Sequence, residues 1–331
     1  MKPSIAEWSV IGHDHAVSML QRALSGGELS HAYLITGPSG VGKTTLALEF
    51  AAALFCESEE RRPCGACSGC RRVAAGSHPD LHLVESASSG TSLKIEQIRA
   101  LQHSLALTPA EGSWRVAILQ RLEEATAAAT NALLKSLEEP PSYVVMLVLA
   151  RDAESLLPTI VSRCQHIPLR PQPVAVIQHA LMSRWGATLE KASLLAHLAD
   201  GRLGWAVRTL QDPAALGRRD RCLDDLDRLL AAPTTHRFQY AAELAKDACA
   251  AQEILGYWLT WWRDVMLCSA GDDSLLVNID RRADLYSYAR TFGVRGSAAA
   301  VEAVRDVSER IQRNASLRLA LEVLMLDIPT R

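Results

Sequence analysis

The sequence has no excess of charge of either sign, because 35 Lys and Arg residues face 37 Asp and Glu residues and the formal net charge is −2. A chain so close to neutrality has no overall attraction for nucleic acid, so any contact with DNA must be local or made within a larger assembly. Its 331 residues, 48% of them hydrophobic, can bury a large core divided among two or three domains. This excludes a disordered or fibrous protein.

The sequence also lacks the segments that direct a chain to or across a membrane. Residues 1–10 have neither the basic start nor the apolar run of a signal peptide, and no uncharged stretch is long enough to span a bilayer. We therefore expect a cytoplasmic protein with no membrane partner. In that compartment the eight cysteines are expected to be thiols or metal ligands and not disulfides.

A glycine-rich loop stands between a predicted strand at 32–36 and a predicted helix at 44–54. It matches the P-loop pattern, in which backbone N–H groups face the phosphates, the lysine reaches the β and γ oxygens and the next hydroxyl holds Mg²⁺. The alternative, a glycine turn that merely joins strand to helix, is disfavoured by this context. We predict that ATP or ADP, with Mg²⁺, is bound by Gly37, Pro38, Ser39, Gly40, Val41, Gly42, Lys43, Thr44 and Thr45.

Hydrolysis also needs an acidic pair at the end of a neighbouring strand, one carboxylate for Mg²⁺ and one for the attacking water. The predicted strand at 114–119 is followed by Gln120 and Arg121 instead. Glu123 and Glu124 come next, and we expect them on a helix that faces elsewhere. The sequence therefore predicts weak or absent turnover, unless the strand ends a few residues from its predicted position.

Strands and helices alternate through the first half of the sequence. Further strands are predicted at 81–85 and 143–150, with helices at 95–107 and 123–139. Alternation of this kind indicates a parallel sheet covered by helices on both faces. Beyond residue 174 the sequence has helical periodicity, which Gly271 and Gly293 are expected to interrupt.

Four cysteines follow the spacing C-x7-C-x2-C-x2-C, with glycines that allow tight turns between them. Four sulfur ligands leave no position for water, so the spacing predicts a structural Zn²⁺ site that contributes folding energy. An iron–sulfur cluster is another occupant of four thiolates, and ordinary buried cysteines are the third interpretation. The predicted ligands are Cys56, Cys64, Cys67 and Cys70.

Several short strings beside these motifs resemble bacterial clamp-loader proteins of the AAA+ class: HAYL at 31–34, SHPD at 77–80, NALLKSLEEPP at 131–141 and TIVSRC at 159–164. With the phosphate loop they cover most of residues 8–170. The resemblance implies a subunit of the heteropentameric clamp loader of DNA polymerase III, with gamma/tau and delta subunits as partners. Such a complex uses ATP to place a sliding clamp on primed DNA.

The resemblance also implies the fold class and three domains. The fold is α/β, with an AAA+ P-loop nucleotide-binding domain at 1–170 that contains a parallel sheet and an inserted zinc module at 56–70. A small helical lid domain follows at 171–211. An all-α C-terminal collar domain, which holds subunits together, is expected at 212–331.

In this family the Ser-Arg-Cys triplet supplies an arginine to the ATP of a neighbouring subunit, which implies that Arg163 is a catalytic arginine finger acting in trans. A guanidinium suits this role because it is always charged and can fork across two phosphate oxygens. The alternative is an ion pair between Arg163 and a carboxylate of its own domain.

Catalytic positions of the hydrolysing family members are missing here. Those members have a hydroxyl-bearing sensor where this chain has Ala150 and Arg151, and a lid arginine where it has Gly204. Together with Gln120 and Arg121, these departures resemble the subunit that does not turn over ATP. Three alternatives remain open: an ATP-hydrolysing gamma/tau-type subunit, a stand-alone P-loop kinase or transferase, and a zinc-dependent DNA-binding protein.

One predicted helix carries a broad apolar face formed by Trp258, Trp261, Trp262 and Val265. Such a face packs into the core of its own domain or, because aromatic residues are enriched at subunit contacts, against another subunit.

Overall fold

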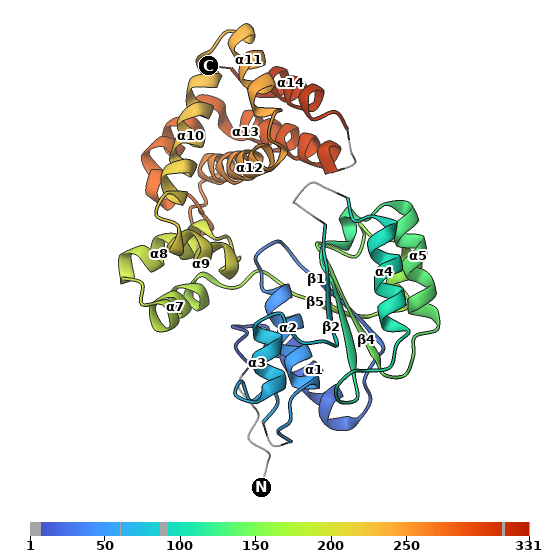
Figure 1. The fold of residues 1–331 in the computed structure, drawn as a ribbon. Coiled ribbons are helices and arrows are strands. Elements are labelled where there is room, and N and C mark those ends of the chain that lie inside the picture. Colours follow the sequence, from blue (N-terminus) through green and yellow to red (C-terminus); the bar gives the residue numbers. More distant parts are fainter. Residues whose placement is uncertain (1–7, 60, 87–91, 313–314, 331) are drawn as a thin grey trace. The chain divides into compact units, whose positions relative to one another are not determined.

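The computed structural model describes residues 8–59, 61–86, 92–312 and 315–330 (Figure 1). The chain divides into two compact units, Met1–Val176 with Gly201–Trp205, and Ile177–Asp200 with Ala206–Arg331. The division into three domains stays a prediction. Within the described ranges, no helix has the length and apolar character needed to cross a membrane.

The first unit contains a five-stranded parallel sheet in the order β2-β3-β4-β1-β5. Three of its strands, β1, β3 and β4, are buried at every residue. Such strands are covered on both faces, which explains their continuous apolar sequences. The strands are β1 (Ala32–Thr36), β2 (Leu81–Val84), β3 (Arg115–Leu119), β4 (Val144–Ala150) and β5 (Gln165–Pro168).

Alternate residues of β1 enter two different cores. Tyr33 and Ile35 pack with α1 and α2, whereas Ala32 and Leu34 pack with α4 and α5. Figure 1 shows these helix pairs on opposite sides of the sheet. The predicted α/β class, with helices on both faces, is confirmed. The helices of this unit are α1 (Asp14–Gly26), α2 (Lys43–Leu54), α3 (Ser68–Ala74), α4 (Ile95–Leu105), α5 (Ala127–Glu138) and α6 (Pro158–Val161).

Two details of the sheet unit differ from the sequence prediction. Strand β5 was not predicted, and the single helix expected at 123–139 is a 3-10 turn, η1 (Leu122–Glu124), followed by α5. The break occurs because Thr126 takes an extended conformation and its side chain accepts a hydrogen bond from the N–H of Ala129. A side-chain cap of this kind starts a new helix.

The described chain beyond Pro173 is helical, as predicted. Gly271 ends α12 with φ 79°, and Gly293 interrupts α13 with φ 60°. The elements are α7 (Val174–Trp185), α8 (Leu189–Leu198), α9 (Leu203–Gln211), α10 (Ala215–Ala231), α11 (Thr234–Leu244), α12 (Ala248–Ala270), η2 (Ile279–Arg281), α13 (Arg282–Gln312) and α14 (Leu317–Asp327).

The aromatic face of α12 forms the core of the second unit. Trp258 and Trp262 are fully buried, and Trp262 meets Phe292 of α13 edge to face with ring centroids 5.3 Å apart. The four side chains of this face are at most 3% exposed. Core packing is therefore their use.

Candidate nucleotide site and metal centre

The phosphate loop connects the end of β1 to the start of α2. Gly37, Gly40 and Gly42 have φ values of 150°, 81° and 120°, a region that favours glycine. A Cβ on Gly37 would lie 2.5 Å from the carbonyl oxygen of Leu169. The loop therefore needs glycine for its backbone conformation. It leads directly into the N-terminus of α2, where backbone N–H groups can bind an anion.

Lys43, the first residue of α2, lies across this loop. Its amino group donates hydrogen bonds to the carbonyl oxygens of Gly37 and Pro38, the second at 3.2 Å. Burial lowers the pKa of Lys43, while the nearby carboxylate of Glu123 raises it. The amino group of Lys43 thus lies on the backbone of the phosphate loop, and its charge interacts with that of Glu123.

Two side chains distant in sequence form hydrogen bonds that support the phosphate loop. The ring Nε2 of His13 lies 3.0 Å from the carbonyl oxygen of Val41, and the side-chain amide of Gln172 lies 3.1 Å from Nδ1 of the same ring. Burial lowers the pKa of His13. Sequence reasoning missed His13 and Gln172, because they are 159 positions apart and belong to no motif.

Gly204, where the resemblance implies a lid arginine in the hydrolysing members, touches the phosphate loop with its backbone. Its N–H donates to the carbonyl oxygen of Gly40 at 2.7 Å, and a Cβ on Gly204 would lie 2.9 Å from that oxygen. A side chain here would push the loop carbonyl aside. The absence of arginine is therefore matched by a close backbone contact.

Gln120 and Arg121, which stand where the sequence analysis expected an acidic pair in an active ATPase, have structural partners. The N–H of Gln120 donates to Val84 of the neighbouring strand at 2.8 Å. Arg121 has a left-handed backbone (φ 51°), and its guanidinium lies 3.2 Å from Glu124 and donates to the hydroxyl of Ser86 at 2.8 Å. Glu124 thus has partners of its own, Arg121 and Ser86.

Glu123 lies in the tight turn η1, which follows β3 where a longer helix was predicted. The charges of Glu123 and Lys43 interact. Burial raises the pKa of Glu123, while Lys43 and Arg151 lower it. The 3-10 turn and these charge interactions are the observations that bear on the expected position of Glu123.

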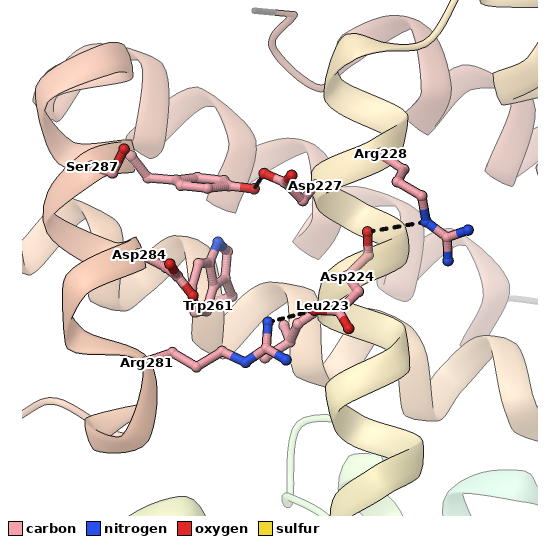
Figure 2. Close-up of a pocket in the computed structure, with 9 residues that line it drawn as sticks. Leu223, Asp224, Asp227, Arg228, Trp261, Arg281, Asp284 and Ser287 are labelled. Atoms are coloured by element: carbon pink, nitrogen blue, oxygen red, sulfur yellow. Dashed lines mark hydrogen bonds and ion pairs between the residues drawn. The ribbon is translucent and has the colours of Figure 1, made fainter.

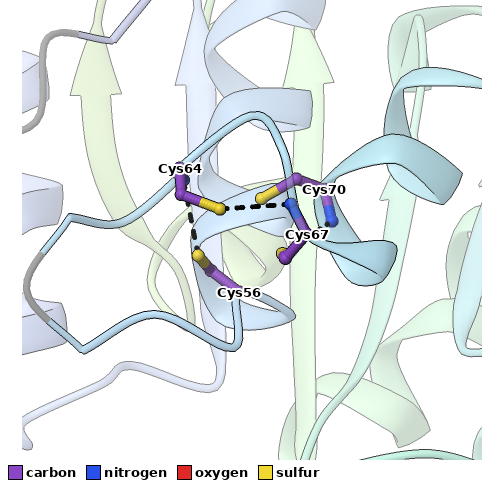
Figure 3. Close-up of side chains that lie close together, drawn as sticks. All are labelled: Cys56, Cys64, Cys67 and Cys70. Atoms are coloured by element: carbon purple, nitrogen blue, oxygen red, sulfur yellow. Dashed lines mark hydrogen bonds between the residues drawn. The ribbon is translucent and has the colours of Figure 1, made fainter.

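The four predicted metal ligands come together in space. Their sulfur atoms all lie within 4.8 Å of one another, between the end of α2 and the start of α3 (Figure 3). Sulfurs bound to one Zn²⁺ at about 2.3 Å would lie about 3.8 Å apart, so the cluster fits a tetrahedral site. The residues are Cys56, Cys64, Cys67 and Cys70.

Backbone N–H groups point at the sulfurs of the cluster. The N–H groups of Cys64, Cys67 and Cys70 lie 3.3–3.4 Å from the sulfurs of Cys56, Cys64 and Cys67, respectively. N–H donors from Ala66 and Cys67 lower the pKa of Cys64 to about 6. Such donors favour thiolates, which are the metal-binding form of cysteine. The four clustered cysteines suggest a structural zinc site.

Arg163 follows the short helix α6 and is paired within its own domain. Its guanidinium donates to Glu138 at 2.7 Å and to the carbonyl oxygen of Thr159 at 2.9 Å. The side chains of Arg163 and Glu138 are 33% and 48% exposed. The intradomain ion pair that the sequence left open is present, at the surface.

A cavity of about 440 Å³ lies in the second unit between α10, α12 and α13 (Figure 2). Several of its polar groups have partners: Arg281 lies 2.7 Å from Asp224, and the hydroxyl of Tyr288 donates to Asp227 at 2.5 Å. None of the predicted site residues lines it. The lining residues are Leu223, Asp224, Asp227, Arg228, Trp261, Arg281, Asp284, Ser287 and Tyr288.

Known proteins match this chain either in its N-terminal half or along nearly its whole length. A family model described as "DNA polymerase III, delta subunit" matches residues 12–173. DNA polymerase III subunit delta' of Bacillus subtilis is 29% identical over 314 residues, which are 94% of each chain. The chain belongs to the clamp-loader family of bacterial DNA polymerase III. A second delta' subunit, from Pseudomonas aeruginosa, is 40% identical over 41% of this chain and 42% of its own.

Clamp-loader subunits of the tau type match a shorter part. The tau subunit of Escherichia coli is 38% identical over 173 residues, which are 52% of this chain and 26% of tau. A solved structure, a gamma subunit-related protein of Thermotoga maritima, covers 93% of this chain and 97% of its own with a TM-score of 0.44 and 16% identity. Short strings indicated a clamp-loader protein, and the missing catalytic positions indicated the delta' type. The match to a delta' subunit over 94% of the chain confirms this resemblance.

Proposed function

We propose that this clamp-loader subunit binds ATP or ADP at its phosphate loop, turns it over poorly, and donates Arg163 to the ATP of a neighbouring subunit. The observation that carries nucleotide binding is the loop itself. Three glycines hold φ values that suit a phosphate-binding backbone, and Lys43 lies across it. The predicted loop residues from Gly37 to Thr45 remain the proposed contacts.

Poor turnover is supported by the positions around the loop. A carboxylate pair is replaced by Gln120 and Arg121, and Arg121 is held by Glu124 and Ser86. The sensor position has Ala150, which is buried, and Arg151, which pairs with Asp152 at 3.0 Å. The lid position is Gly204, whose backbone contacts the loop.

The role of Arg163 is supported by the weakness of its present partner. An ion pair between exposed side chains contributes only about 0–1 kcal/mol. A phosphate with more than one negative charge can therefore displace Glu138, and a guanidinium binds two phosphate oxygens at once. The proposed partner site is the nucleotide of the adjacent subunit.

The proposed setting is the cytoplasmic heteropentamer with gamma/tau and delta subunits, which loads the sliding clamp onto primed DNA. The relatives named as delta' and tau subunits support this setting. The cysteine cluster would hold Zn²⁺ as a structural ion that closes the loop between α2 and α3.

The competing function is that of a gamma/tau-type ATPase, favoured by the 38% identity to tau over half of the chain. Steady-state ATP hydrolysis by the isolated chain, with and without primed DNA, separates the two. We expect turnover close to background. Robust hydrolysis that Lys43→Ala abolishes would contradict our proposal and support the ATPase.

A further inference from the structure

Glu123 has a buried carboxylate oxygen that accepts no hydrogen bond from the described residues. Its Oε2 atom is inaccessible to solvent and has no hydrogen-bond partner among the described residues. Its charge interacts with those of Lys43, in the phosphate loop helix, and Arg151, which follows β4. A buried acceptor without a partner is unfavourable and calls for a ligand or a structural reason.

The two nearby cations are engaged with other groups. Lys43 donates to the carbonyl oxygens of the loop, and Arg151 lies 3.0 Å from Asp152. Burial raises the pKa of Glu123, so its surroundings do not compensate fully for lost water. The oxygen is therefore not saturated by protein groups, and it follows β3 at the sheet edge where the phosphate loop follows β1, because these strands are parallel and are joined through β4.

The neighbouring carboxylate is in a different situation. Glu124 accepts a hydrogen bond from Ser86 at 2.7 Å and pairs with Arg121 at 3.2 Å. Glu123 and Glu124 are adjacent in sequence, yet Oε2 of Glu123 has no hydrogen-bond partner among the described residues, whereas Glu124 is bonded to two side chains. This difference points to a ligand for Glu123 on the side of the loop.

We propose that Glu123 is the carboxylate that faces the Mg²⁺ ion of bound nucleotide, in place of the acidic pair lost at Gln120 and Arg121. The proposal rests on the proposed nucleotide site. Mg²⁺ prefers oxygen ligands and in nucleotide sites is held by one or two carboxylates, the phosphates and water. The orphaned oxygen fits such an ion, and the hydroxyl of Thr44 at the start of α2 is the other group expected to hold it.

The charge of Glu123 gives this role a distinctive signature. Without metal, a carboxylate that faces the loop repels the polyphosphate. With Mg²⁺ present, the same carboxylate attracts the ion and so supports nucleotide binding. A purely structural glutamate would not reverse its effect when the metal is added.

The test is equilibrium binding of ATP to the full-length chain, by calorimetry, in excess Mg²⁺ and in excess EDTA. For the unsubstituted chain we expect tighter binding with Mg²⁺. In Glu123→Gln, ATP should bind more tightly than in the unsubstituted chain in EDTA, and the gain from Mg²⁺ should fall by about tenfold, the scale of one screened charge interaction. Glu124→Gln is the matched control and should keep the metal dependence unchanged.

Three results would overturn the proposal. Unchanged metal dependence in Glu123→Gln would remove the role of Glu123 and leave the nucleotide site in place. Equal weakening in Mg²⁺ and EDTA, with a lower thermal midpoint, would show a structural residue. If the unsubstituted chain binds no ATP, the proposed nucleotide site fails, and the role of Glu123 fails with it.

Discussion

At the scale of single residues, Asp80 shows how a buried charge fixes the sheet. Its side chain is inaccessible to solvent and accepts hydrogen bonds from the N–H groups of Ala110 and Glu111, both at 2.8 Å, and from Arg115 at 3.0 Å. The loop before β3 and the first residue of β3 are thus tied to the start of β2. Asp80 is the last residue of the SHPD string, so at least this residue of the string has a structural role.

Asp80→Asn tests this use. The amide retains one acceptor but leaves Arg115, which is 6% exposed, without its charge partner. Breaking a buried, hydrogen-bonded pair is strongly destabilising, and we expect a loss of roughly 2–4 kcal/mol in the free energy of unfolding. Urea denaturation followed by circular dichroism measures it. Glu111→Gln, which alters an exposed pair with Arg72, should change stability little.

The same carboxylate predicts a pH dependence. Burial alone would raise the pKa of Asp80, but the N–H groups of Ala110 and Glu111 and the charge of Arg115 hold it below its ordinary value. The stabilisation is therefore complete above the unfolded pKa, at about 4, and is lost as the pH falls through the lower, folded pKa. We expect Asp80→Asn to lose stability less steeply than the unsubstituted chain on acidification. An identical acid slope in both proteins would count against this account.

At the scale of elements, burial on both faces made strands predictable. Strands β1 and β4 have continuous apolar sequences and lie within a residue of their predicted bounds. Strand β5 was missed because its sequence, QHIP, is polar and only Ile167 is buried. Its pairing with β1 comes from the fold, which a four-residue sequence does not reveal.

The residues of the candidate site also divide into those that a local sequence pattern predicted and those that it did not. The phosphate loop and the cysteine cluster were predicted because each is a local pattern with fixed spacing. The single helix predicted at 123–139 was wrong, because the cap at Thr126 separates the turn η1, which holds Glu123, from α5. The contacts of His13 with Gln172, and of Gly204 with Gly40, join distant parts of the chain. Only the folded chain shows such contacts.

We expect the loop between α2 and α3 to depend on a metal bound by its cysteine cluster. Cys64→Ser removes one of four ligands, and we expect loss of bound zinc and a thermal midpoint lower by roughly 5–10 °C, because metal binding contributes directly to folding. Metal analysis and calorimetry measure the two effects. Cys249→Ser, exposed and outside the cluster, is the control. Visible absorbance typical of iron and sulfur would identify the other occupant.

At the scale of the whole molecule, the aromatic face of α12 is buried in the core of its own unit, so it is not available for contact with another subunit. Arg163 is different, because it lies at the surface and its partner Glu138 is half exposed. Within an assembled clamp loader we expect Arg163→Ala to leave the complex intact and to lower DNA-stimulated ATP hydrolysis by the neighbouring subunit. Arginine fingers contribute about 10³-fold or more to a single site.

Glu138→Gln separates the trans role from the ion pair within the domain. It removes the charge that holds Arg163 at 2.7 Å but keeps the guanidinium in place. If the arginine acts on a neighbour's phosphate, hydrolysis in the assembled complex should be preserved or rise, whereas Arg163→Ala lowers it. If Arg163 serves only its pair with Glu138, both substitutions should have the same small effect on ATP hydrolysis, and an unchanged rate in Arg163→Ala would refute the trans role. Size-exclusion chromatography of each complex confirms that assembly is equal.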